Sequence, residues 1–245
     1  SDGMARIGHV WFIGQKQLTG DLKAKIILSP VGPPKMLHNF ELQWSLKNNL
    51  GIKQVEIGRF VAPFGREWSN IRIDNVATVG YSAIFSPAIA RENGVTVHGK
   101  TNSTNWDAGV FYGDRIGGNI ANIDDSIPTE YLRLRQEFGK WLSIGVSQRF
   151  GPVDASGLDA QYVDGKLKLT FEEVSSQDIS QWYILGEQSV GKHTAVLRYE
   201  DLKGGEQRRT PGARVKLSGN REVKFNAVFS NTTPDKVVGQ FIQRW

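Results

Sequence analysis

The stretch Tyr131-Leu132-Arg133-Leu134-Arg135-Gln136-Glu137-Phe138 alternates apolar and polar side chains over the length of one strand. Successive side chains of a strand point to opposite faces, so the two leucines and Phe138 share one face while both arginines and Glu137 share the other. The same alternation returns in the segments 142–149, 167–172, 213–217 and 223–229. This pattern predicts a sheet with one apolar face and one charged face.

Segments of this kind run along the whole chain and are divided by clusters of Gly, Asn, Asp and Pro, whereas helical periodicity is almost absent. Short turns, such as 139–140 and 164–165, alternate with longer connections, of which 64–92 is the longest. A meander with short turns on one rim and longer loops on the other is typical of an outer-membrane barrel. We expect fifteen strands, at residues 4–14, 17–29, 36–47, 51–62, 93–101, 105–113, 129–138, 141–150, 156–163, 166–175, 181–189, 192–201, 211–218, 222–230 and 236–245.

The composition is compatible with one turn-rich domain over residues 1–245, because the chain has 27 glycines, 9 prolines and no cysteine. The absence of cysteine excludes disulfides and thiolate chemistry. A net charge of +5 would suit nucleic acid, an anionic membrane or an anionic substrate, and by itself it does not choose among them. No run of about 18 apolar residues is present, so a membrane could be spanned only by a closed barrel of strands.

A water-soluble sandwich would also alternate, with its charges solvated on the outside. Two features favour the membrane barrel. The mean hydropathy is only −0.35 although the strands have apolar faces, as expected for a barrel with a wet interior. Aromatic residues stand at strand ends, which suits interfacial girdles. These aromatics are Trp11, Trp44, Trp106, Trp141, Trp182 and Tyr199.

The last strand gives a third reason. It ends on Trp245, with Val237 and Phe241 on the same face, and such an ending resembles the C-terminal signal that outer-membrane insertion machinery reads. The expected fold class is therefore all-β: a transmembrane, antiparallel, up-and-down β-barrel of about sixteen strands, with fifteen in this chain.

The segment Val55-Glu56-Ile57-Gly58-Arg59-Phe60-Val61-Ala62-Pro63-Phe64-Gly65-Arg66-Glu67 resembles the phosphate-selective porin O and P family. The order of residues 5–14, 20–25, 86–99 and 106–113 also resembles that family, so the likeness covers about residues 4–113. The resemblance implies a sixteen-stranded barrel, usually in trimers, with one long loop folded into the pore as a constriction.

Two departures from the family stand out. The chain is much shorter than typical members, so its outer loops must be trimmed. Its first strand also runs toward the rim of short turns, which leaves an odd count and an open edge. Either a strand is missing, or another chain supplies it, or the count is wrong by one.

The loop at about 64–92 is the candidate constriction. Its centre, residues 76–85, is apolar, so we expect burial inside the barrel. The loop carries Arg66, Arg72 and Arg91, and arginines at a narrow point favour anions. The alternative is that these arginines only tie the loop to wall carboxylates such as Glu41, Glu56 or Glu137.

The alternation of side chains along each strand, here called parity, also predicts which charged residues face the inside of the barrel. It predicts a basic inner wall, which raises the local concentration of anions. The alternative is that many of these cations brace the barrel through cross-strand ion pairs. Six acids are expected on the same face: Asp21, Glu41, Glu137, Asp159, Glu172 and Glu200. The eleven expected cations are Lys23, Lys25, Lys100, Arg133, Arg135, Arg149, Lys168, Arg198, Arg214, Lys216 and Lys224.

These features predict a passive, anion-preferring porin of the bacterial outer membrane, with phosphate as one candidate solute. Its expected partners are the lipid bilayer, lipopolysaccharide, small anions and two further copies in a homotrimer, but not nucleic acid. We expect no enzyme activity, cofactor or metal site, because no Gly-x-Ser-x-Gly, metal-ligand or nucleotide-binding motif is present. The alternative is a structural barrel that sheathes or anchors a larger assembly.

Overall fold

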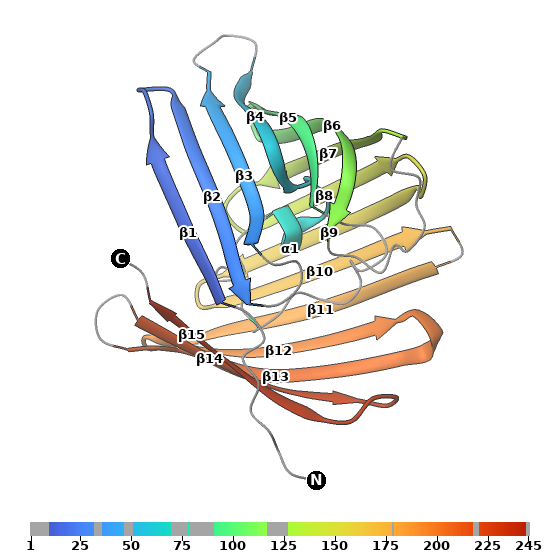
Figure 1. Ribbon diagram of the computed structural model, residues 1–245. Coiled ribbons are helices and arrows are strands. Elements are labelled where there is room, and N and C mark those ends of the chain that lie inside the picture. Colours follow the sequence, from blue (N-terminus) through green and yellow to red (C-terminus); the bar gives the residue numbers. More distant parts are fainter. Residues whose placement is uncertain are drawn as a thin grey trace.

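The computed structural model describes residues 10–31, 36–46, 51–69, 78, 91–116, 127–177, 179–217 and 221–243. They form one antiparallel sheet of fifteen strands, in which each strand pairs with its neighbours in the sequence (Figure 1). The strands are β1 (Val10–Gln17), β2 (Leu22–Val31), β3 (Met36–Ser45), β4 (Ile52–Val61), β5 (Arg91–Thr101), β6 (Thr104–Ile116), β7 (Thr129–Phe138), β8 (Leu142–Phe150), β9 (Ala155–Asp164), β10 (Leu167–Ser176), β11 (Ile179–Val190), β12 (His193–Leu202), β13 (Glu206–Lys216), β14 (Arg221–Ser230) and β15 (Lys236–Gln243).

Two short helical turns accompany the sheet, α1 (Arg66–Ser69) and η2 (Lys203–Gly205). Neither is long and apolar enough to cross a membrane, nor is any other helix in the part of the chain that the structure describes.

The predicted fold class is confirmed, and most strand bounds agree within one or two residues. The first hairpin differs, because its turn lies at Leu18–Asp21 and not before residue 17. The side-chain amide of Gln17 explains the shift, since it donates to the carbonyls of Thr19 (2.7 Å) and Leu22 (3.2 Å) and so stabilises the later turn. Strand β13 also begins five residues earlier than predicted, at Glu206.

The short turns have a shared geometry. Gly139, Gly165 and Gly191 each have φ near +60° (63°, 54° and 59°) and are each followed by a lysine. Leu167 pairs with Asp164, so the central residues of that turn are 165 and 166, and only the glycine has a positive φ. A turn with glycine at its first central position and a single positive φ is the type II′ hairpin.

The two faces of the sheet reverse the arrangement of a water-soluble protein. Leu134 on β7 is 47% exposed, whereas its neighbour Arg133 is 3% exposed. The same holds on β14, where Phe225 is exposed and Lys224 is buried. Apolar side chains thus cover the convex outer face, and charged side chains line the concave inner face. Such a surface is stable only against an apolar medium such as lipid.

Aromatic side chains cluster on the outer face near both rims. Near the rim of short turns, Trp141 and Tyr162 are in edge-to-face contact, with ring centroids 6.2 Å apart. Near the opposite rim, Trp182 and Tyr199 lie 5.5 Å apart. These two levels agree with the predicted girdles.

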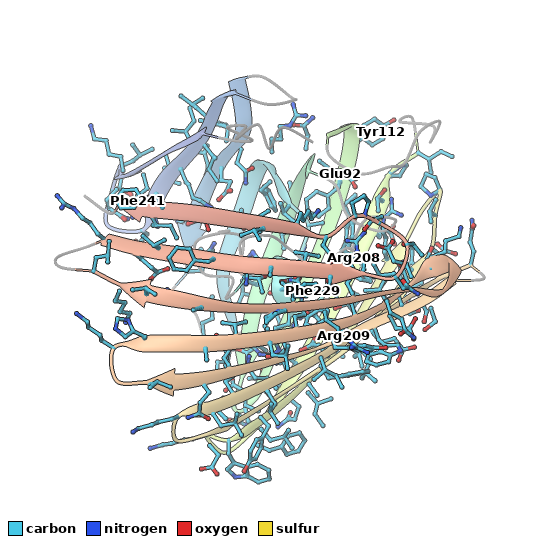
Figure 2. All side chains as sticks on the ribbon, turned by 90° about the horizontal axis from the view of Figure 1, so that it is seen from below. Glu92, Tyr112, Arg208, Arg209, Phe229 and Phe241 are labelled. Atoms are coloured by element: carbon cyan, nitrogen blue, oxygen red, sulfur yellow. The ribbon has the colours of Figure 1, made fainter. Side chains whose placement is uncertain are left out.

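The end of the sheet has the same outer face. Val237 and Phe241 on β15 are 81% and 61% exposed, and Figure 2 labels Phe241 on this part of the sheet. The predicted insertion signal Trp245 and the side chain of Trp11 lie outside the described residues.

The edges of the curved sheet are β1 and β15, and no pairing joins them in the described ranges. Because the strands alternate in direction and their number is odd, both edge strands run the same way. An antiparallel closure of this ring therefore needs one further strand, whereas a direct closure would be parallel. The count of fifteen strands in the described ranges agrees with the prediction.

Candidate functional site

The chain enters the space inside the sheet directly after β4. Residues 62–67, here called the crossing segment, leave the end of β4 and continue into α1, which lies within the curve of the sheet (Figure 1). All six residues are buried, and Ala62 and Phe64 have no exposed surface. The segment contacts strands β8, β9, β10 and β12, which are several positions away from β4 in the sheet.

Arg66 attaches the crossing segment to β8 and β9. Its Nε donates to Asp159 Oδ1 (2.9 Å), its Nη2 to Ser143 Oγ (2.7 Å) and its Nη1 to Gln161 Oε1 (3.3 Å). Asp159 also accepts from Arg133 Nη2 (2.8 Å), so one carboxylate links the segment to β7 as well. Charge-assisted hydrogen bonds of this kind are the stronger ones in proteins.

Glu172 on β10 provides a second attachment. Its carboxylate accepts from the backbone N–H of Glu67 (3.0 Å) and from the backbone N–H of Arg66. The hydroxyl of Tyr183 on β11 donates to the same carboxylate. The backbone donors at the start of α1 are thereby satisfied although they are buried.

Arg198 on β12 makes the third attachment. Its Nη1 pairs with Glu67 (3.4 Å) and donates to the hydroxyl of Thr78 (2.9 Å), while its Nε lies 3.2 Å from Glu200. Thr78 is the one described residue in the range 70–90, and it is buried. The predicted burial of the apolar stretch 76–85 otherwise falls outside the described residues.

Apolar contacts support these polar attachments. The ring of Phe64 lies against Gly157 on β9, so closely that a Cβ at position 157 would come within 3.2 Å of it. Nearby, the rings of Phe60, Phe111 and Tyr131 meet edge to face, with successive centroids 5.2 Å apart. The buried apolar cluster of this protein therefore lies inside the curve of the sheet, around the crossing segment.

The predicted wall cations all belong to the inner face, and ion pairs hold many of them. Five are buried, namely Lys25, Arg133, Arg149, Arg198 and Lys224. Six are partly exposed or exposed, namely Lys23, Lys100, Arg135, Lys168, Arg214 and Lys216. The pairs are Lys25–Glu41, Arg133–Asp159, Arg198–Glu200, Arg214–Glu222, Lys168–Glu187, Lys100–Glu137 and Arg135–Glu137.

Of the three arginines predicted in the loop, the structure describes Arg66 with its side chain and Arg91 by its backbone alone. Arg66 is anchored to the wall, but by Asp159 and not by Glu41, Glu56 or Glu137. Arg91 begins β5, where its backbone pairs with Val61 and Ile116. Arg72 and the side chain of Arg91 lie outside the described residues.

The eleven cations and six acids predicted for the inner face leave an excess of five cations, and this excess is too high. Several carboxylates that are not among the six expected acids also face inward, namely Glu56, Glu92, Asp107, Glu187, Glu206 and Glu222. Among the described residues, six Lys and Arg side chains and eight Asp and Glu side chains are buried. Asp21, one of the predicted acids, lies in the exposed first turn.

Arg208 and Arg209 fall between the expected strands 192–201 and 211–218, but the structure places them within a strand. Both residues belong to β13, and Figure 2 labels them there. Arg208 Nε pairs with Glu206 (2.7 Å), whereas Arg209 is exposed. The early start of β13 is the reason, since it turns the predicted loop into strand.

Two cavities on the inner face are lined by several charged side chains. The first, of about 320 Å³, is lined by four Lys and Arg side chains but only two carboxylates, Glu56 and Asp107. The second, of about 240 Å³, is lined by Arg66, Arg135 and Lys140 with Glu137 as its carboxylate. Lys53 and Lys140, which stand next to short turns in the sequence, each line one of these cavities.

His98 lies between the two carboxylates of the first cavity. Its Nδ1 is 2.7 Å from Asp107 and its Nε2 is 3.2 Å from Glu56. Both ring nitrogens are engaged by carboxylates, so His98 has no nitrogen left for a metal ion. No group of three metal-ligating side chains occurs in the described ranges.

No family model and no curated protein matches this sequence. Many solved structures share its fold at low sequence identity, and they include the following three. A loop L8 deletion mutant of OmpT, an outer membrane protein of Vibrio cholerae, superposes with a TM-score of 0.62 at 14% identity, over 97% of this chain and 91% of that one. A mutant of the Rh. blastica porin gives 0.61 at 12% identity, over 96% and 89%.

The third is the anion-selective porin from Comamonas acidovorans, with a TM-score of 0.61 at 18% identity, over 91% of this chain and 78% of that one. At these identities the likeness concerns the fold. The charged interior, the apolar exterior and these superpositions together show that the chain has the β-barrel fold of bacterial outer-membrane porins.

Proposed function

We propose that this protein is a porin of the bacterial outer membrane that forms a passive diffusion channel preferring small anions. The carrying observation is the make-up of the two inner cavities, which together have more Lys and Arg than carboxylates in their lining. The apolar outer face and the porin fold support the membrane setting.

Accessibility makes these cations effective. A fixed cation a few Å from a permeating anion contributes about 1 to 4 kcal/mol, depending on the local dielectric. The same charge at a wide mouth is screened within about 8 to 10 Å. Glu56 and Asp107 are both engaged by His98, so they oppose the neighbouring cations less than two unpaired carboxylates would.

The crossing segment is the proposed constriction. It occupies space inside the sheet, and its Arg66 lines the second cavity while remaining attached to Asp159. We propose that the loop around it, with Arg72 and Arg91, narrows the pore and sets its charge preference. Chloride, phosphate and organic carboxylates belong to the proposed class of solutes, and lipid, lipopolysaccharide and a homotrimer are the proposed surroundings and assembly.

The test is reconstitution of the purified protein in a planar bilayer under a potassium chloride gradient. We expect stable open channels and a reversal potential of the sign that chloride permeation gives. A reversal potential on the potassium side would refute the anion preference, and a bilayer that stays silent would refute the channel.

A structural barrel is the second candidate, and the buried apolar cluster inside the sheet favours it. Val174, Leu185, Val196 and Leu202 belong to this inner cluster, so part of the interior is filled with packed side chains. A barrel that inserts and folds without conducting would support the sheath or anchor role.

A further inference from the structure

The 320 Å³ cavity on the inner face has two chemically different sides. Lys53, Lys100 and Arg135 contribute cations, whereas Phe60, Val61 and Pro63 contribute apolar surface. We propose that this cavity binds small organic carboxylates that have an apolar body, in preference to inorganic anions such as phosphate. The inference rests on the proposed channel function and names the solute class that the cavity selects.

Arg135 is the group best placed to receive a carboxylate. Its Nη2 is 3.4 Å from Glu137, a long contact for a charged hydrogen bond, and 35% of its side chain is exposed. A guanidinium offers several donors in one plane, which matches the two oxygens of a carboxylate. Arg135 therefore retains donors that a carboxylate ligand would satisfy.

The apolar side decides between organic and inorganic anions. Inorganic phosphate presents oxygens in every direction, and those facing Phe60 and Pro63 would lose their water without gaining a donor. A carboxylate on an apolar body carries its charge at one end only, so its body can cover the apolar side. Phe60 is held in place by edge-to-face contact with Phe111, at 5.2 Å and 70°.

The size of the cavity agrees with a single-ring ligand. Its volume of about 320 Å³ lies near the lower end of the roughly 300 to 1,000 Å³ that is usual for small-molecule sites. Arg133 is buried and paired with Asp159 (2.8 Å), whereas Lys53, Lys100 and Arg135 are exposed or partly exposed and are therefore the accessible cations of the site.

The experiment measures how benzoate, acetate and inorganic phosphate reduce the chloride current through single wild-type channels at constant ionic strength. We expect benzoate to half-block at a concentration at least about tenfold lower than either of the other anions. Equal block by benzoate and acetate would overturn the apolar contribution, and stronger block by phosphate would overturn the proposed solute class.

Three variants assign the effect to the cavity. Arg135→Gln should weaken benzoate block at least about tenfold, because the forked donor is lost. Val61→Thr should narrow the gap between benzoate and acetate, and Lys192→Gln, at the exposed β11–β12 turn outside the cavity, should leave both unchanged. Anion-selective channels without benzoate preference would refute this inference alone, whereas cation-selective or silent channels would refute the proposed function.

Discussion

Replacing Arg66 by methionine should loosen the crossing segment without removing its other attachments. Methionine keeps a similar length but loses all three hydrogen bonds to Asp159, Ser143 and Gln161. Asp159 retains its pair with Arg133 at 2.8 Å, so no buried carboxylate is left without a cation. The cost should therefore be that of a lost charged hydrogen bond, about 2 kcal/mol, and not the larger penalty of an orphaned charge.

A cost of about 2 kcal/mol corresponds to a roughly 30-fold larger population of the detached segment. Because the segment occupies the interior, detachment should widen the pore. Single-channel recordings should then show the time spent in higher-conductance states rising by about this factor. Attachment through Glu172 and Arg198 should keep the detached state in the minority.

Arg214→Met is the matched control. Arg214 also pairs with a wall carboxylate, Glu222 at 2.8 Å, but none of its described contacts involves the crossing segment. Its loss should lower barrel stability without changing the conductance states. If the Arg66 and Arg214 variants gave the same recordings, the crossing segment would not be the element that narrows the pore.

Three further predictions concern the barrel, its selectivity and its backbone. The purified protein should show heat-modifiable gel migration in detergent, and a folded, monodisperse protein in plain buffer would contradict the membrane barrel. Changing Lys100 and Arg135 together to glutamate should move the reversal potential toward that of potassium, whereas Lys192→Glu should move it far less. Equal shifts would show that the cavity does not determine the charge selectivity. Gly58→Ala should lower the temperature of heat modification, because Gly58 has φ +136° and a Cβ there would come 2.1 Å from the Phe40 carbonyl oxygen. The resulting strain is about 1 to 3 kcal/mol. Gly20→Ala is its control, because nothing lies within 4 Å of a Cβ at that position.

Alternation was sufficient to assign the faces of the sheet. A strand in a sheet has a fixed period of two, so one well-placed residue such as Arg133 determines the orientation of its whole strand. Lys25 and Lys224, near opposite ends of the sequence, were assigned inward by this rule alone, and both are buried there. The same rule places Asp107 inward, directly opposite Arg133, although Asp107 is not among the six acids expected there.

The contacts of the crossing segment could not be predicted in the same way. Arg66 and Asp159 are 93 residues apart in the sequence, and they meet only because the sheet curls and the segment turns inward. Parity assigns Asp159 to the inner face but gives no information on its partner. Glu41, Glu56 and Glu137 agree with the alternation as wall carboxylates that could hold the loop arginines. In the structure, however, Asp159 and Glu172 hold the segment.

Burial divides the inner charges into two sets with different consequences. The buried set has more acids than bases, since carboxylates such as Asp159 and Glu172 hold the crossing segment and the wall together. Arg66, Arg133 and Glu56 belong to the buried set although they line the cavities. The accessible set there consists of the four bases Lys53, Lys100, Arg135 and Lys140 and the two acids Asp107 and Glu137. A permeating ion responds to nearby, poorly screened charges far more than to distant or paired ones. The anion preference should therefore follow the accessible set and persist in variants that alter the net charge of +5 only at the outer turns.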